Sequence, residues 1–254
     1  MRRAARESGL TLIEILLALG IMGVVMVLIT NWQTGTLDLT TRTNATARGL
    51  TELNDLTGYV GDRVRAAQRV RVATSGFSVN SGSGNACSAL SPCLAVVLPE
   101  TNPTTGAVTK YVLFVYRMEP RSAVTADKTP DDWAETNVQV LREYRSGDSG
   151  TTPVNCVPGA GQTFETATGA GCAAMQGLAG LASVGGFNPY LVADYLTPSD
   201  KLPGSAAPFE WSAATRSVTL RVQFRQQAGG RVTTLPPTQA YALNVQARNA
   251  PVVP

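Results

Sequence analysis

The longest apolar run of the chain lies close to its start, in residues 10–30, and contains one charged residue, Glu14. A helix rises about 1.5 Å per residue, so about twenty residues reach about 30 Å, the thickness of the hydrocarbon core of a bilayer. Arginines precede the run, and positive charge on that side keeps the N-terminus in the cytoplasm. The pattern predicts one transmembrane helix. A carboxylate facing lipid costs roughly 2.5–3.5 kcal/mol, so Glu14 needs a partner or a function.

The helical pattern continues through residues 31–70, which contain no proline. Apolar positions recur there at steps of three and four, while most charged residues fall on other faces. We expect one helix from about Leu12 to Ala67, with an amphipathic second half that packs on a globular domain and loosened turns around residues 34–36 and Gly58. The expected apolar face consists of Leu50, Leu53, Leu56, Thr57, Val60, Val64 and Ala67.

Residues 71–254 have the alternating pattern of β-strands, interrupted by segments rich in Gly, Ser, Thr and Pro. The expected strands 93–98 and 111–117 have a short polar connection, which predicts an antiparallel hairpin. A second hairpin, with its turn at Gly229-Gly230, is expected near the C-terminus. Residues 129–133 resemble a capped helical turn, and residues 190–196 fit either a strand or a short helix. The fold class is therefore α+β. The expected strands are 69–74, 93–98, 111–117, 138–144, 217–224 and 240–249.

Four cysteines stand in two local groups, Cys87 with Cys93 and Cys156 with Cys172. The chain has no histidine and no C-x-x-C motif, so a zinc site would need four thiolates at unusual spacing. Outside the cytoplasm disulfides are the better interpretation. Three pairings are possible, and we favour the local one.

The segment Gly9-Leu10-Thr11-Leu12-Ile13-Glu14 resembles the cleavage and methylation signal of type IV prepilins and type II secretion pseudopilins. This resemblance implies a cytoplasmic leader, residues 1–9, that prepilin peptidase removes after Gly9, and methylation of the new amine of Leu10. Glu14 is fifth in the mature chain, as in the family. Leu10 departs from the phenylalanine that most members have.

The resemblance also implies a structural role. Glu14 would meet the freed amine of Leu10 in its own or a neighbouring helix, and so would set the register of a filament. The implied partners are other pilin or pseudopilin subunits, the peptidase and methyltransferase, and the inner-membrane assembly platform. The protein would sit in the inner membrane with its globular domain outside the cytoplasm, and then enter a pilus or a periplasmic pseudopilus. Two further features resemble minor pilins, above all J-type pseudopilins and PilW-like proteins. Asn31 stands where many major pilins have a proline that interrupts the helix, and the last expected pair of strands ends in Arg-Asn.

Two other kinds of protein begin with an apolar segment. A secretory signal peptide would have a shorter apolar region and a small-residue cleavage site after it, which residues 30–33 do not provide. A membrane-tethered binding domain or adhesin that never polymerises explains the helix but leaves Glu14 without a role. System type, whether pilus, secretion or competence, stays open.

Enzymatic chemistry finds little support in the sequence. Without histidine, Ser-His-Asp and Cys-His arrangements and histidine metal sites are impossible. Paired carboxylates remain in Asp131 with Asp132 and in Glu165 with Asp194, which we expect to be solvated or capping groups. We therefore expect neither enzymatic activity nor a cofactor nor a metal.

A DNA-contacting face is a further hypothesis with weak support. The formal net charge of +3 falls to about +1 once the three arginines and one glutamate of the leader leave, too near neutral to indicate nucleic acid. Aromatic and basic residues do mix near the C-terminus, but the polar side of a strand pair is the better explanation of them. They are Trp211, Arg216, Arg221, Phe224, Arg225 and Arg231.

Overall fold

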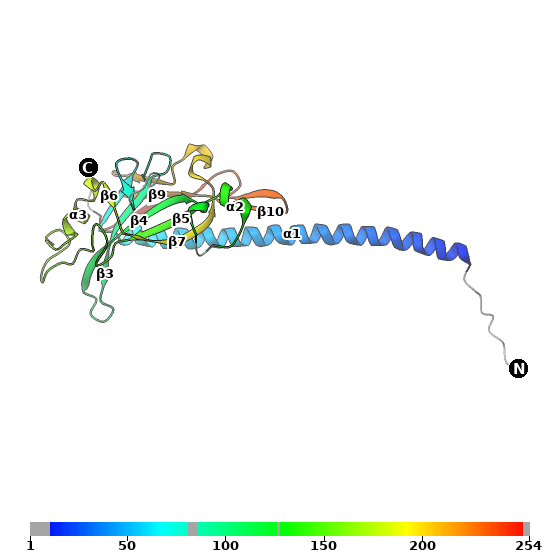
Figure 1. Ribbon diagram of the computed structural model, residues 1–254, viewed down its shortest axis with the longest axis horizontal. Coiled ribbons are helices and arrows are strands. Elements are labelled where there is room, and N and C mark those ends of the chain that lie inside the picture. The colour runs from blue at the N-terminus through cyan, green and yellow to red at the C-terminus, as the bar shows by residue number, and fades with distance from the viewer. Residues whose placement is uncertain (1–10, 81–85, 126–127, 251–254) are drawn as a thin grey trace. The chain divides into compact units, whose positions relative to one another are not determined.

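The computed structural model describes residues 11–80, 86–125 and 128–250. The chain divides into two compact units, residues 1–45 and residues 46–254. Helix α1 (Leu12–Ala66) begins in the first unit and ends in the second (Figure 1). Its bounds agree with the expected helix, and the chain combines this long N-terminal helix with an antiparallel β domain, so the α+β class is confirmed.

The first unit is helical throughout its described part, and the loosening expected at residues 34–36 does not occur. The hydroxyl of Thr34 donates to the carbonyl of Asn31 and that of Thr36 to the carbonyl of Trp32, both at 2.9 Å. Both hydroxyls bond back to backbone carbonyls of the preceding turn, and the helix continues through them without a break. Gly58, in the second unit, is also an uninterrupted part of α1.

The C-terminal part of α1 supplies one wall of the main core. Leu53, Leu56, Thr57, Val60, Val64 and Ala67 are buried, as the spacing predicts. Leu50 is an exception: its side chain is 56% exposed, so the prediction that it belongs to the buried face is wrong. Position 49, one residue earlier, takes the close contact instead, because Gly49 lies against the ring of Phe224.

Most strands form one seven-stranded antiparallel sheet in the order β1-β3-β4-β5-β7-β10-β11. A three-stranded antiparallel sheet has the order β12-β9-β8, and β2 pairs with β6 in parallel. The bounds are β1 (Arg69–Ala73), β2 (Ser78–Val79), β3 (Cys93–Thr101), β4 (Val108–Pro120), β5 (Gln139–Arg145), β6 (Ser183–Val184), β7 (Asn188–Leu196), β8 (Phe209–Ser212), β9 (Ser217–Val222), β10 (Phe224–Ala228), β11 (Arg231–Leu235) and β12 (Tyr241–Gln246).

Strands β3 and β4 form the predicted hairpin, and residues 190–196, left open between strand and helix, belong to β7. The predicted capped turn is the short helix α2 (Asp132–Asn137), where the carboxylate of Asp131 accepts from the backbone N–H of Ala134 at 3.1 Å. The other short helices are η1 (Arg121–Ala123), α3 (Cys172–Gln176), η2 (Leu178–Gly180), η3 (Ser199–Lys201) and η4 (Pro203–Ser205).

The closing hairpin differs from the prediction. The expected strand 217–224 divides at Gln223, so that β9 belongs to the smaller sheet and β10 to the larger. The turn at Gly229-Gly230 joins β10 to β11, and β12 pairs with β9. Gln223 is buried and hydrogen-bonded to the hydroxyl of Thr197 and the carbonyl of Pro236. These contacts hold the chain where it changes sheet, which strand alternation alone does not reveal.

The larger sheet has a core on each face. Along β3, Leu94 and Val96 point into the core shared with α1, while Cys93, Ala95 and Val97 point into a second core on the other face. The second core contains both disulfides, Cys87–Cys93 and Cys156–Cys172, which is the local pairing among the three alternatives. Its outer cover is largely the loop-rich chain between β5 and β7.

Candidate assembly helix and binding surface

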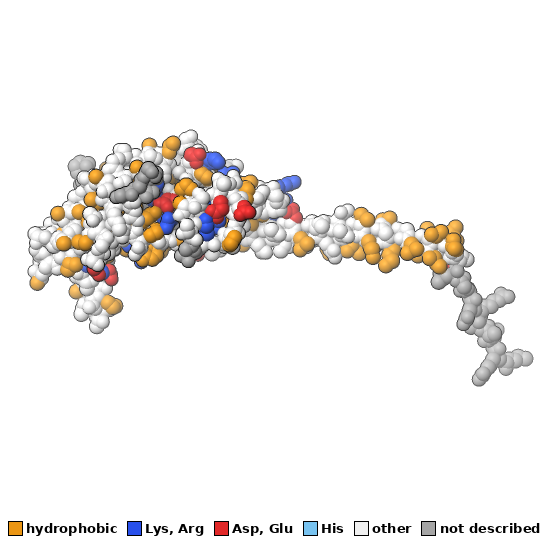
Figure 2. Space-filling view, in the orientation of Figure 1, with side chains coloured by type: hydrophobic (Ala, Val, Ile, Leu, Met, Phe, Trp, Pro, Cys, Tyr) orange, Lys and Arg blue, Asp and Glu red, His pale blue; other side chains and the backbone are white. Residues whose placement is uncertain are grey.

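The first part of α1, from Leu12 to Ile29, presents an apolar surface apart from Glu14. Its large side chains from Leu12 to Ile29 are exposed, and Figure 2 shows hydrophobic side chains gathered along this part of the helix. Within the described residues, α1 is the one helix long and apolar enough to cross a membrane. Water disfavours so much apolar surface, so the length and composition of this helix are compatible with a single-pass membrane anchor.

Glu14 has partners in its own helix. Its carboxylate accepts from the backbone N–H of Thr11 at 2.9 Å and from the Thr11 hydroxyl at 2.8 Å. The N–H of Glu14 in turn approaches the Thr11 hydroxyl oxygen at 3.4 Å. This reciprocal arrangement is a capping box, which satisfies backbone donors at a helix start. The chain carries the known signature of this motif, Thr-x-x-Glu before an apolar run, so this role of Glu14 was predictable beside the one expected above.

Gly9 and Leu10, the predicted cleavage and methylation positions, lie outside the described residues. The small residues nearby lie within them. A Cβ built at Gly20 or at Gly23 meets nothing within 4 Å, and residues three apart share one side of a helix. Gly20 and Gly23 leave a shallow strip on which a second helix has room to approach closely, whereas Ala18, two residues before Gly20, lies on the other side of the helix.

Of the four carboxylates paired in the sequence analysis, Asp131, Glu165 and Asp194 each have a partner in another element, whereas Asp132 is exposed in the first turn of α2. Glu165 pairs with Arg69 at 2.5 Å, whereas Asp194 pairs with Arg121 at 2.9 Å, so these two acids do not form one site. Asp131 caps α2 and also accepts from the hydroxyl of Tyr195 at 3.0 Å. Burial, followed by the bond to Asp131, raises the pKa of Tyr195 to about 12, so its hydroxyl stays protonated as a donor.

Buried charge clusters are a feature that sequence analysis missed. Arg121 is fully buried and contacts Asp194, Glu135 at 2.6 Å and the carbonyl of Thr129 at 2.6 Å. Lys128 completes the group by donating to Glu135 at 2.6 Å. The cluster ties the segment that follows β4 to β7 and α2. In the sequence, the only indication of this cluster is that charged residues stand next to strongly apolar strands. The residues that pair with Arg121 lie far from it in the chain, so the pairs themselves were not predictable.

A second cluster joins α1 to β4 and β5. Glu143 is fully buried and contacts Arg145, Arg63 and the hydroxyl of Tyr116, the last at 2.7 Å. Burial is the main cause that raises the pKa of Tyr116 far above its usual value, so this tyrosine remains a hydrogen-bond donor. Buried acids need such partners because an unpaired charge in the interior is strongly destabilising. These charges therefore fix the packing of the strands.

Of the residues suggested for a DNA-contacting face, Phe224 does not belong to an exposed face, while DNA contact by the others stays a prediction. Phe224 is buried, with 2% of its surface exposed, because β10 packs it against α1 at Gly49. Arg225 and Arg231 belong to the larger sheet, whereas Arg221 belongs to the smaller one. Arg221 is also neutralised by Glu210 at 2.7 Å. The crossing of the chain at Gln223 separates residues that are close in sequence.

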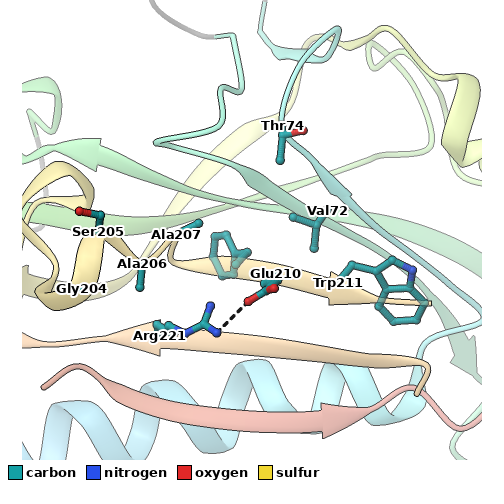
Figure 3. Close-up of a pocket in the computed structure, with 10 residues that line it drawn as sticks. Val72, Thr74, Gly204, Ser205, Ala206, Ala207, Glu210, Trp211 and Arg221 are labelled. Atoms are coloured by element: carbon teal, nitrogen blue, oxygen red, sulfur yellow. Dashed lines mark ion pairs between the residues drawn. The ribbon is translucent and has the colours of Figure 1, made fainter. Parts of the chain in front are cut away.

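The globular unit contains an open hollow of about 650 Å³. Figure 3 shows it beside β1 and β8, with Val72 and Trp211 close to one another at one end, Ser205 at the other, and the Glu210–Arg221 ion pair along it. The turn at residues 204–207 lines the rest. Its surface mixes an indole ring, hydroxyls and a neutral ion pair, a composition suited to binding rather than to metal coordination or acid–base catalysis.

Across the described part of the chain, no group of three or more Cys, Asp or Glu side chains is placed to hold a metal ion. Comparison of the chain with protein-family models, with curated protein sequences and with solved structures yields no match.

Proposed function

We propose that this protein is a minor pilin or pseudopilin, a structural subunit that helps to initiate or cap a type IV pilus or a type II secretion pseudopilus. The observation that carries the proposal is the combination of the Gly9–Glu14 segment with a long helix, whose first part exposes its apolar side chains, joined to an antiparallel β domain. In this proposal the helix first anchors the protein in the inner membrane. It then packs among other subunit helices, whose apolar surfaces replace lipid.

Glu14 is the residue through which assembly would be specified. The capping box uses one oxygen of its carboxylate, Oε2, in both of its bonds from Thr11. The other oxygen and the negative charge stay available for the methylated amine of Leu10 in a neighbouring subunit. An ion pair in hydrocarbon is much less costly than either charge alone, so pairing favours the assembled form.

Two substitutions separate the charge of Glu14 from its capping role. Glu14→Gln keeps an acceptor for the capping box but removes the charge, whereas Thr11→Val removes the capping hydroxyl and keeps the charge. We expect Glu14→Gln to remain in the inner-membrane fraction and to fall at least tenfold in sheared or cross-linked filaments. Thr11→Val should assemble at close to the normal level.

The opposite result, normal assembly of Glu14→Gln with loss of Thr11→Val, would show that Glu14 only caps the helix. Leader processing is checked on the same material by intact mass. We expect loss of residues 1–9, one methyl group on Leu10, and retention of the leader in Gly9→Leu. A native protein that still begins with Met1 would contradict the proposal.

Two observations favour a second candidate, a membrane-tethered binding domain that does not polymerise. The capping box gives Glu14 a use within a single chain, and the hollow at β8 gives the globular unit a place to bind a ligand. This candidate predicts an unprocessed N-terminus and normal function of the Glu14→Gln variant.

A further inference from the structure

Helix α1 changes character just after its apolar part, and Trp32 stands at the change. From Leu12 to Ile29 the side chains are exposed on every side of the helix, and no charged residue occurs between Glu14 and Asp38. One partner helix covers one stripe of such a surface, whereas a bilayer covers all of it. Lipid is therefore the surrounding that fits this segment.

The length of the apolar segment places its outer boundary beside Trp32. Hydrocarbon about 30 Å thick takes about twenty helical residues at a rise of about 1.5 Å each. Counted from Leu12, about twenty residues end at Asn31. The edge of the hydrocarbon therefore falls in the turn of α1 that contains Trp32.

The turn around Trp32 has the intermediate polarity of a lipid headgroup region. Its sequence neighbours Asn31 and Gln33 are polar but uncharged. The hydroxyls of Thr30 and Thr36 each donate to the carbonyl four residues earlier, at 2.9 Å. Because these hydroxyls are satisfied inside the helix, the threonines leave their methyl groups to contact the surroundings. The segment is thus neither fully apolar nor charged.

Trp32 itself has the side chain suited to such a boundary. It is 75% exposed, and its indole combines a large apolar ring with one N–H donor. Side chains of an α-helix lean toward the N-terminus, so the ring leans over the last apolar turn, which ends at Ile29. The first charges beyond Trp32 are the Asp38–Arg42 pair at 2.7 Å, and Asp38 stands about 9 Å farther along the helix.

We propose that Trp32 binds the lipid–water interface of a phospholipid bilayer on the non-cytoplasmic side, with its ring against the acyl chains and its N–H in the headgroup region. Residues 12–29 then lie in hydrocarbon, and Asp38 lies outside it. The side of the membrane follows from the arginines that precede the apolar run. The proposal rests on the membrane-anchored stage of the proposed function and does not depend on polymerisation.

The test measures the depth of indole rings in phospholipid vesicles that contain the full chain. Trp133→Phe and Trp211→Phe together leave Trp32 as the one tryptophan. The vesicles carry bromine, which quenches tryptophan fluorescence on contact, either near the carbonyl end or near the methyl end of the acyl chains. We expect bromine near the carbonyl end to quench Trp32 at least twofold more strongly than bromine near the methyl end.

Two matched variants place the indole elsewhere on the same side of the helix. In the same background with Trp32→Phe, Ile21→Trp moves it eleven residues earlier and Leu39→Trp seven residues later, each close to a whole number of turns. Both positions are exposed, as Trp32 is. We expect the indole at position 21 to be quenched more strongly by the deeper bromine and the indole at position 39 by neither.

The outcomes separate failure of this proposal from failure of the proposed function. Equal quenching of Trp32 by both bromines, stronger quenching by the deeper one, or quenching at position 21 without any at Trp32 would overturn the interfacial role alone. Absence of quenching at position 21 as well would mean that protein rather than lipid covers this side of α1. That result would also contradict the membrane-anchored stage of the proposed function.

Discussion

Single residues in this protein take their roles from partners distant in sequence, and Glu52 is an instructive case. It stands on α1, and its carboxylate accepts from the backbone N–H of Asp194 at 2.9 Å. Partial burial is the main cause that raises its pKa above the ordinary 4.5, against the opposing effects of that hydrogen bond and of Arg48. The nearby charges of Asp194 and Asp55 raise it further. Near neutral pH, ionised Glu52 therefore lowers the free energy of unfolding.

The sign of the resulting pH dependence follows from proton linkage. A carboxyl whose folded-state pKa is raised contributes its full stability below the unfolded value of about 4.5 and loses it as the pH rises through the raised value. Glu52→Gln keeps an acceptor for Asp194 and removes the titration. We expect the variant to be more stable than the wild type at pH 7, with the difference shrinking toward pH 4. Urea unfolding across this range measures it, and Asp62→Asn, at an exposed helix position, serves as the control.

At the scale of elements, two glycines of α1 show how packing decides the effect of the same substitution. A Cβ at Gly49 would lie 2.5 Å from Cδ1 of Phe224 and 2.9 Å from Cδ1 of Leu235, whereas a Cβ at Gly58 meets nothing within 4 Å. Alanine gains about 1 kcal/mol over glycine inside a helix, while overpacking costs about 1–3 kcal/mol. We expect Gly58→Ala to stabilise by up to about 1 kcal/mol. Gly49→Ala should be neutral or destabilise by up to about 2 kcal/mol, the overpacking cost less the helix gain.

Thermal and urea unfolding of the two variants provide the measurement. Equal stabilisation by both would mean that β10 does not press on α1 at position 49. Such a result would contradict the packing that places Phe224 in the core rather than on a nucleic-acid surface.

At the scale of the whole molecule, the two disulfides close loops of different length in the second core. The cysteine pairs are separated by 16 residues for Cys156–Cys172 and by 6 for Cys87–Cys93. In the chain-entropy description these loops stabilise the folded state by about 3 and about 2 kcal/mol. Replacing each pair by alanine should therefore destabilise in that order, as read from urea unfolding of the full chain. A larger loss from the Cys87–Cys93 pair would refute this account.

Local patterns were sufficient for much of this protein. Residue spacing along one helix, strand alternation and the Asp131 cap depend on neighbours in sequence, so α1, the β3–β4 hairpin and α2 were predictable from the chain alone. The motif at Gly9–Glu14 is local in the same sense, and its support for the assembly proposal comes from the sequence of that segment rather than from tertiary contacts.

Tertiary structure decided what depends on contacts between distant segments. The sheet crossing at Gln223, the partners of Arg121 and Glu143, and the exposure of Leu50 all follow from which element covers which face. Sequence spacing carries no such information, because a strand with the same alternation fits either sheet. The hollow at Trp211 is the clearest example, since it exists only where the edges of two separately assembled sheets come to lie side by side.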